Sequence, residues 1–407
     1  WRPSTTSGPP ATRERPARYG ERRDPRGEGV RAVNGTWRED VQEDGGARDR
    51  RELERLGGVR TDLAVEAHEV ASAGLRGREI PGVRTEREDF PFGYVVRVDV
   101  ESEEGGRLLG KLPGKYVTFH IPELRTRWRE FSGEVAPRLA REIEVFLSSM
   151  GVDAGDPLLV VGLGNWNATP DNVGPLTVSK LLVTRHLHEY KVLPEELLGR
   201  MRPVAALSPG VLGITGVETA EVVRGVVEAI RPAAVICVDA LASKSVERIG
   251  TTVQVADVGI SPGSGVGNKR VGLTRETLGV PVLAIGVPTV IYATTIVSDA
   301  LDALSAHWTR ARTPSPAGSM LDPSRIVVTP RDRAPATHSG FDAGLLALSG
   351  EGRRELLAQV LGPSMGTLIV TPKEVDVLVD TLSGILADAL NEALHPGISA
   401  EEAALLR

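Results

Sequence analysis

The chain has 407 residues, of which 41% are hydrophobic, so it is long and apolar enough to bury a sizeable core. Its 48 Lys and Arg residues against 54 Asp and Glu residues give a net charge of -6, which disfavours a surface that binds nucleic-acid phosphates directly. The single cysteine, Cys237, excludes an intramolecular disulfide and favours a reducing compartment. Without a secretory signal or an apolar run of roughly 18 residues, the sequence predicts a cytoplasmic protein that does not enter a membrane.

The first part of the chain differs in composition from the rest. Residues 1–58 are rich in Arg, acidic residues, Gly and Pro, and they show little apolar periodicity. Such a segment buries too little apolar surface to offset the entropy lost on ordering. We therefore predict a disordered N-terminal extension or propeptide over residues 1–58, followed by a single α/β domain over residues 59–407.

The first elements expected in this domain are strands. Residues 92–100 and 115–121 alternate apolar and polar side chains, which is typical of half-buried strands. They define a β-rich subregion at about residues 90–125. A long amphipathic helix is expected over residues 128–150, and the continuous apolar run 158–163 indicates a central parallel strand.

Helical and strand-like segments alternate through the remainder of the domain. The expected helices are 176–186, 219–230, 289–305 and 373–394, and the expected strands are 233–238, 282–285 and 367–371. This alternation predicts a doubly wound, mostly parallel sheet with helices on both faces. The stretch at about residues 311–338, rich in Pro, Arg and Ser, is expected to be a loop insertion.

Two carboxylates follow strands of the predicted sheet. Asp171 lies in the loop after the strand that ends at Leu163, and Asp239 directly follows the strand 233–238. If these strands are parallel neighbours, both carboxylates lie at the sheet edge where such folds bind ligands. Paired carboxylates in a shielded cleft do not both ionise easily, so one holds a proton while the other deprotonates a water. The alternative is that each Asp only caps a helix, loop or strand end.

Other candidate sites are weaker. The stretch Gly162-Leu163-Gly164 lacks the third glycine of a dinucleotide motif, and the stretch 259–270 lacks the Gly-Lys-Ser/Thr of a P-loop. Turns or substrate-contact loops are therefore expected at both places. Cys237 lies inside an apolar strand, which favours a buried structural thiol over a nucleophile. His186 and His188 are too close in sequence to share one helical face, which argues against a zinc pair.

Five collinear stretches carry a further signal, and they include TPDNVGP around Asp171 and ICVDALASKSVERIG around Asp239. They are residues 59–67, 160–187, 236–270, 370–380 and 389–395. Together they resemble the germination protease family, whose members degrade small acid-soluble spore proteins. An ordered set of this length is far more specific than any single glycine motif.

The resemblance implies an atypical aspartic-type endopeptidase with a fold similar to hydrogenase-maturation proteases. It also implies a self-processing zymogen that assembles as a homotetramer, needs no cofactor, and acts on small acid-soluble spore proteins in the forespore. The two essential aspartates of the family fall on Asp171 and Asp239. Because family substrates are cut after an acidic residue, and Thr61-Asp62-Leu63-Ala64-Val65-Glu66 resembles their cut sequence, we expect self-cleavage between Asp62 and Leu63.

Other readings of the same residues stay open at this point. One alternative is a metal-dependent maturation peptidase of the same fold, with Asp171 and Asp239 as metal ligands, which would require a histidine in the cleft. Another is a noncatalytic α/β module that binds a peptide or a nucleotide. For Asp62 and Leu63, the alternative is the opening turn of a helix with Thr61 as N-cap; such a helix could also protect the bond until it opens locally.

Overall fold

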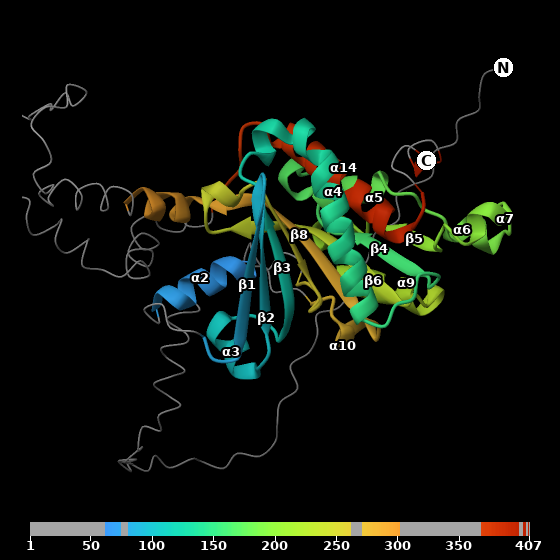
Figure 1. The fold of residues 1–407 in the computed structure, drawn as a ribbon, viewed down its shortest axis with the longest axis horizontal. Helices are drawn as coiled ribbons and strands as arrows, with labels where there is room; N and C mark the ends of the chain where they lie inside the picture. Colours follow the sequence, from blue (N-terminus) through green and yellow to red (C-terminus); the bar gives the residue numbers. More distant parts are fainter. Residues whose placement is uncertain are drawn as a thin grey trace, which may run out of the picture. The chain divides into compact units, whose positions relative to one another are not determined.

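The computed structural model (Figure 1) describes residues 62–74, 80–261, 271–301, 368–398, 402–403 and 406. These residues belong to one compact unit. The predicted extension 1–58, most of the glycine-rich stretch 259–270 and the predicted loop insertion 311–338 lie outside the described residues.

The described strands form one sheet with a parallel and an antiparallel half. The strands are β1 (Val83–Phe90), β2 (Gly93–Val100), β3 (Gly114–His120), β4 (Leu158–Gly162), β5 (Val204–Leu207), β6 (Ala234–Ser243), β7 (Thr252–Ala256), β8 (Val282–Tyr292) and β9 (Ile369–Val370). Their order is β1-β2-β3-β7-β8-β6-β4-β5, and β9 pairs with β8. The strands β5, β4, β6 and β8 are parallel to their neighbours within this group, while all other pairings are antiparallel.

Helices cover both faces of the sheet. The described residues include the helices α2 (Ala64–Gly74), α3 (Glu103–Leu109), α4 (Leu124–Ser149), α5 (Val173–Ser179), α6 (Arg185–Glu189), α7 (Glu195–Leu198), α8 (Leu212–Thr215), α9 (Thr219–Ile230), α10 (Arg275–Leu278) and α14 (Val375–Leu394). Helices α4, α5 and α14 share one hydrophobic core with the sheet. Helices α9 and α10 pack on the opposite face, where α2 packs against β2 and β3 (Figure 1).

Burial on both faces explains the apolar runs that predict the central strands. In β6, Ile236 and Val238 enter the core beneath α4 and α14, whereas Val235 and Cys237 enter the core beneath α9. Strand β1 is the opposite case. It pairs with β2 along its whole length, but its sequence VRTEREDF is charged and mostly exposed, as suits an edge strand that resists further pairing.

The predicted α/β class and the doubly wound parallel core are confirmed, and the β-rich region joins this core in the same sheet. The helix expected over residues 219–230 coincides with α9. The helix expected over residues 176–186 is wrong, because the chain forms α5 and α6 instead, and the Leu182 amide between them donates to Asn391 Oδ1 of α14 at 2.8 Å.

The helix expected from residue 289 is also wrong at its start. Residues 289–292 belong to β8, which pairs with β6 as far as Ile291 and with β9 at Ile291 and Tyr292, and helical structure begins at Ala293. Among the described helices, none combines the length and the apolar character needed to cross a membrane.

Candidate active site

A cleft opens where the sheet changes its direction of winding. The chain leaves β4 toward α5 on one face and leaves β5 toward α9 on the other face. In open α/β sheets, crossovers that diverge in this way leave a crevice at the carboxyl ends of the strands. Here the crevice is a cleft of about 630 Å³, lined by the loop after β4, by parts of β6, β7 and β8, and by the segment before α2.

Asp171 is held in this cleft by the fold of the loop after β4. It ends a 3-10 turn, Thr169–Asp171, and its Oδ2 accepts a hydrogen bond from the Asn165 amide at 2.7 Å. Gly164 allows the loop to close, because it has φ +117° and a Cβ at this position would lie 2.0 Å from the Asp171 carbonyl oxygen. The loop therefore fixes the Asp171 carboxylate through its own backbone.

Asp239 reaches the same cleft from β6. The last pair between β4 and β6 is Gly162 with Val238, so Asp239 is the first residue of β6 beyond the end of β4. Its Oδ1 accepts a hydrogen bond from the Ala240 amide at 2.9 Å, and the residue is only 5% exposed. The expected parallel adjacency of the two strands is confirmed, but the expectation that Asp239 ends its strand is wrong, because pairing with β8 continues β6 to Ser243.

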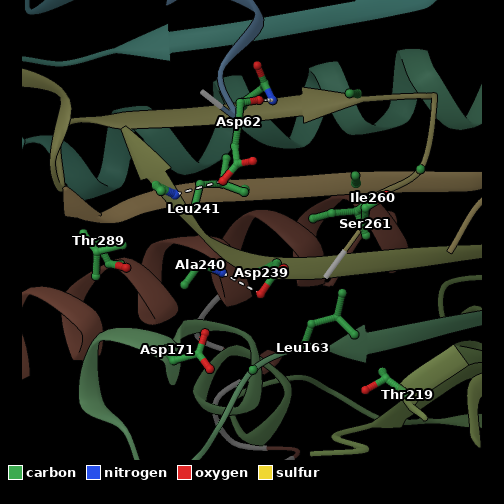
Figure 2. Close-up of a pocket in the computed structure, with 18 of the residues that line it drawn as sticks. Asp62, Leu163, Asp171, Thr219, Asp239, Ala240, Leu241, Ile260, Ser261 and Thr289 are labelled. Atoms are coloured by element: carbon green, nitrogen blue, oxygen red, sulfur yellow. Dashed lines mark hydrogen bonds between the residues drawn. The ribbon is translucent and has the colours of Figure 1, made fainter. Parts of the chain in front are cut away.

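The two carboxyl groups differ in electrostatic environment. Burial raises the pKa of Asp171, and the hydrogen bond from Asn165 opposes this rise. Burial raises the pKa of Asp239 well above its ordinary value, and the negative charges of Asp171 and Asp62 raise it further. In Figure 2, Asp239 lies between the other two acidic side chains. Asp239 therefore retains a proton more readily than Asp171, which is the asymmetry that acid–base chemistry requires.

Asp62 lines the same cleft (Figure 2). Its side-chain Oδ2 accepts a hydrogen bond from the Ala242 amide of β6 at 3.0 Å. Leu63 is fully buried, and α2 begins directly after it at Ala64. A helix therefore begins here, as the alternative expects, and the Asp62–Leu63 bond lies beside the cleft. Self-cleavage at this bond stays a prediction. Thr61, the expected N-cap, lies outside the described residues.

The first turn of α2 is fixed by a buried carboxylate. The two carboxylate oxygens of Glu66 lie 3.0 and 3.1 Å from the amide nitrogen of Lys244, the residue after β6. Glu66 Oε1 also lies 3.5 Å from Arg248 Nε, and Arg248 donates to Glu69 at 2.6 Å. These contacts hold the segment after Asp62 against β6.

Two polar side chains also contact this segment, and the sequence predicts neither of them: Lys111 Nζ donates to the Asp62 carbonyl oxygen, and Gln254 Oε1 accepts from the Ala64 amide. Gln254 offers a signal, since it is a polar residue at the centre of the apolar strand β7. Lys111 offers none, because it lies in a turn between α3 and β3 like many surface lysines.

The remaining sequence candidates lie elsewhere. Cys237 is fully buried in the core beneath α9, and burial raises the pKa of its thiol. His186 and His188 belong to α6, where His188 Nε2 lies 2.9 Å from the Met201 carbonyl oxygen. Among the described residues that line the cleft there is no histidine. Within the described ranges, no cluster of three or more His, Cys, Asp or Glu is arranged to hold a metal ion.

The fold and the cleft define a class: an α/β protein with a shielded pair of carboxylates at the switch point of its sheet, an arrangement suited to acid–base hydrolysis. The sequence profile of the family described as Germination protease matches residues 62–406. The chain belongs to the germination protease family, and this membership gives it a protease role in spore germination.

Curated relatives match over most of their length. The germination protease of Bacillus licheniformis is 42% identical over 350 residues, which are 84% of this chain and 94% of the relative. The germination protease of Bacillus subtilis is 42% identical over 352 residues, with coverages of 84% and 95%. That of Clostridium acetobutylicum is 40% identical over 347 residues, with coverages of 85% and 98%.

One solved structure is similar over a smaller part of the chain. It is the [NiFe] hydrogenase maturation protease HycI from Thermococcus kodakarensis, which is 20% identical and matches 36% of this chain and 80% of its own. The TM-score of 0.24 is too low to support a shared mechanism.

Proposed function

We propose that this chain is an atypical aspartic-type endopeptidase in which Asp171 and Asp239 act as an acid–base pair. We further propose that it cuts its own chain between Asp62 and Leu63, and that its substrates are small acid-soluble spore proteins. The observation that carries the proposal is the meeting of Asp171, Asp239 and Asp62 in one cleft. Residues far apart in sequence thus bring an acid, a base and a candidate cleavage site together.

The pKa directions support a separate role for each carboxyl group in this proposal. In this proposal Asp171 is the base, because the Asn165 hydrogen bond opposes the rise of its pKa by burial. It removes a proton from a water, whose oxygen adds to the carbonyl carbon of the peptide bond. Asp239 is protonated and gives its proton to the leaving amine as the carbon–nitrogen bond breaks. The products are a new carboxylic acid at the end of the acidic residue and an amine on the residue that follows, and the acid then gives its proton to the amine. A proton then passes from Asp171 to Asp239 and restores the starting state.

The proposal includes a zymogen form of the chain. Before cleavage, the segment from Asp62 to Glu66 is docked against β6, where it lies in or beside the cleft that a substrate needs. Cleavage separates Asp62 from α2 and allows the upstream part of the chain to leave. The sequence resemblance supports two further parts of the proposal, a homotetrameric assembly and action in the cytoplasm of the forespore.

The proposed function is tested by incubating the purified protein with a small acid-soluble spore protein, with and without a chelator. The fragments are then mapped by mass spectrometry, with Asp171→Asn as the inactive control. We expect cuts after acidic residues that the chelator does not change. Loss of cleavage in the chelator would support the metal-dependent alternative, and the absence of any fragment would support the noncatalytic one.

A further inference from the structure

The carbonyl oxygen of Asp62 accepts hydrogen bonds from two side chains. Lys111 Nζ donates to it at 2.8 Å, and Gln254 Nε2 donates to it at 3.1 Å. This oxygen belongs to the Asp62–Leu63 peptide bond. The side chain of Gln254 also reaches beyond the bond, since its Oε1 accepts a hydrogen bond from the Ala64 amide at 2.6 Å. One amide group therefore contacts the chain on both sides of the same peptide bond.

Both donors are positioned by the fold around the cleft. Gln254 lies in β7, where its backbone pairs with Thr118 of β3 and Gly286 of β8, and its side chain is buried. Lys111 follows α3, which ends at a left-handed Gly110. Lys111, Gln254 and the proposed catalytic aspartates all line one cleft. Burial lowers the pKa of Lys111, while the charges of Asp62 and Glu66 raise it.

Docking of α2 alone does not account for this arrangement. A helix N-terminus needs acceptors for its amides, and Gln254 Oε1 supplies one to Ala64. A carbonyl that precedes the helix has no such need for two side-chain donors, one of them a lysine Nζ. Two fixed donors at about 2.7–3.1 Å from a carbonyl oxygen are instead what acyl-transfer enzymes use to stabilise the oxyanion of the tetrahedral intermediate.

We propose that Lys111 and Gln254 are catalytic residues that form the oxyanion site for the peptide bond cut by this protease. This inference rests on the proposed function, because it takes the Asp62–Leu63 bond as the bond that is cut. When water adds to the carbonyl carbon, the π electron pair moves onto the carbonyl oxygen. The Lys111 ammonium and the Gln254 amide stabilise the resulting negative charge without giving up a proton.

The electron pair returns to the carbon as the bond to the Leu63 nitrogen breaks, and that nitrogen takes its proton from Asp239. After self-cleavage, the same two donors hold the corresponding carbonyl oxygen of a substrate. Lys111 and Gln254 thus supply charge stabilisation, while Asp171 and Asp239 move protons.

The test compares two lysine-to-methionine substitutions in the full-length chain. Lys111→Met removes the donor to the Asp62 carbonyl oxygen. Lys180→Met is the matched control, because Lys180 Nζ also donates to a backbone carbonyl oxygen, that of Asp380 at 2.7 Å, but Lys180 does not line the cleft. The first-order rate of cutting between Asp62 and Leu63 is followed by intact mass spectrometry, and hydrogen exchange of the α2 amides reports whether the helix stays docked.

We expect Lys111→Met to slow self-cleavage by about 10²–10³-fold, the loss typical of one oxyanion donor. The α2 amides should keep their protection, and Lys180→Met should cut within about threefold of wild type. If Lys111→Met cuts within threefold of wild type while Asp171→Asn does not cut, the oxyanion site is wrong and the carboxylate pair stands. Loss of α2 protection in parallel with the rate would make Lys111 an anchor only and overturn the inference. A wild-type chain that is not cut between Asp62 and Leu63 would overturn both.

Discussion

The buried carboxylate of Glu66 provides a quantitative test of how α2 is held beside the cleft. Glu66 is 3% exposed, whereas Glu69, one helical turn away, is 56% exposed. Both carboxylates contact the guanidinium of Arg248, which is itself only 8% exposed. The two glutamates therefore offer the same chemical change in two different environments.

Replacing Glu66 by Gln removes the charge and places an amide group next to the Lys244 amide, which is a donor. Charge-assisted hydrogen bonds contribute about 1.5–3 kcal/mol each, and removing one partner of a buried ion pair costs about 3–5 kcal/mol. Because Arg248 keeps its contact with Glu69, we expect Glu66→Gln to lower the free energy of unfolding by about 2–4 kcal/mol. We expect Glu69→Gln to lower it by at most about 1 kcal/mol.

Both substitutions are made in an Asp171→Asn background, so that self-cleavage does not change the chain during the measurement. Urea unfolding followed by circular dichroism gives the free energies, and equal slopes confirm that the same surface is exposed. If Glu66→Gln costs less than about 1 kcal/mol, or no more than Glu69→Gln, the buried contact does not fix α2 as described.

Two further predictions concern the aspartates and their supports. A Cβ on Gly174 would lie 2.3 Å from the Leu163 carbonyl oxygen and 2.4 Å from the Val238 carbonyl oxygen, so Gly174→Ala should lower the free energy of unfolding by at least about 1–3 kcal/mol and abolish cleavage. The control is Gly225→Ala on the open surface of α9, which should raise the free energy of unfolding by up to about 1 kcal/mol. Equal thermal midpoints for the two variants would contradict this prediction. The pKa of Asp239 is raised in the folded state. Its contribution to stability is therefore fully present at pH values below its ordinary pKa of 3.8, and it is lost as the pH rises through the folded-state pKa. Asp239→Asn should therefore raise the thermal midpoint relative to wild type at pH 8 and change it less at pH 4, and a difference independent of pH would refute the shift.

The sequence predicts the parts of the fold that follow from local patterns. The apolar runs of β4, β6 and β8 are visible because both faces of these strands are buried, and α9 is visible because its buried residues Ala220, Val223 and Val227 recur at helical spacing. The apolar pattern does not predict the charged edge strand β1, because β1 is a strand through its pairing with β2 and not through burial.

The sequence likewise predicts some residues of the candidate site and not others. Asp171 and Asp239 follow from the parallel order of β4 and β6, which the alternation of elements predicts. Lys111 and Gln254 meet Asp62 only because β7 pairs with β3 on one side and with β8 on the other, a long-range arrangement that no local pattern encodes. The resemblance points to Asp62, but it is the antiparallel half of the sheet that supplies the groups around it.

The most direct measurement of the central claim is the rate of self-cleavage in Asp171→Asn, Asp239→Asn and the double variant of the full-length chain. Intact mass and N-terminal sequencing follow the appearance of a chain that begins at Leu63. We expect each single substitution to slow this step by at least about 10²–10⁴-fold, and the double variant to lose little more, because the two carboxyl groups act as a unit. A single variant that cuts at a rate within about threefold of wild type, or a new terminus at any residue other than Leu63, would contradict the account.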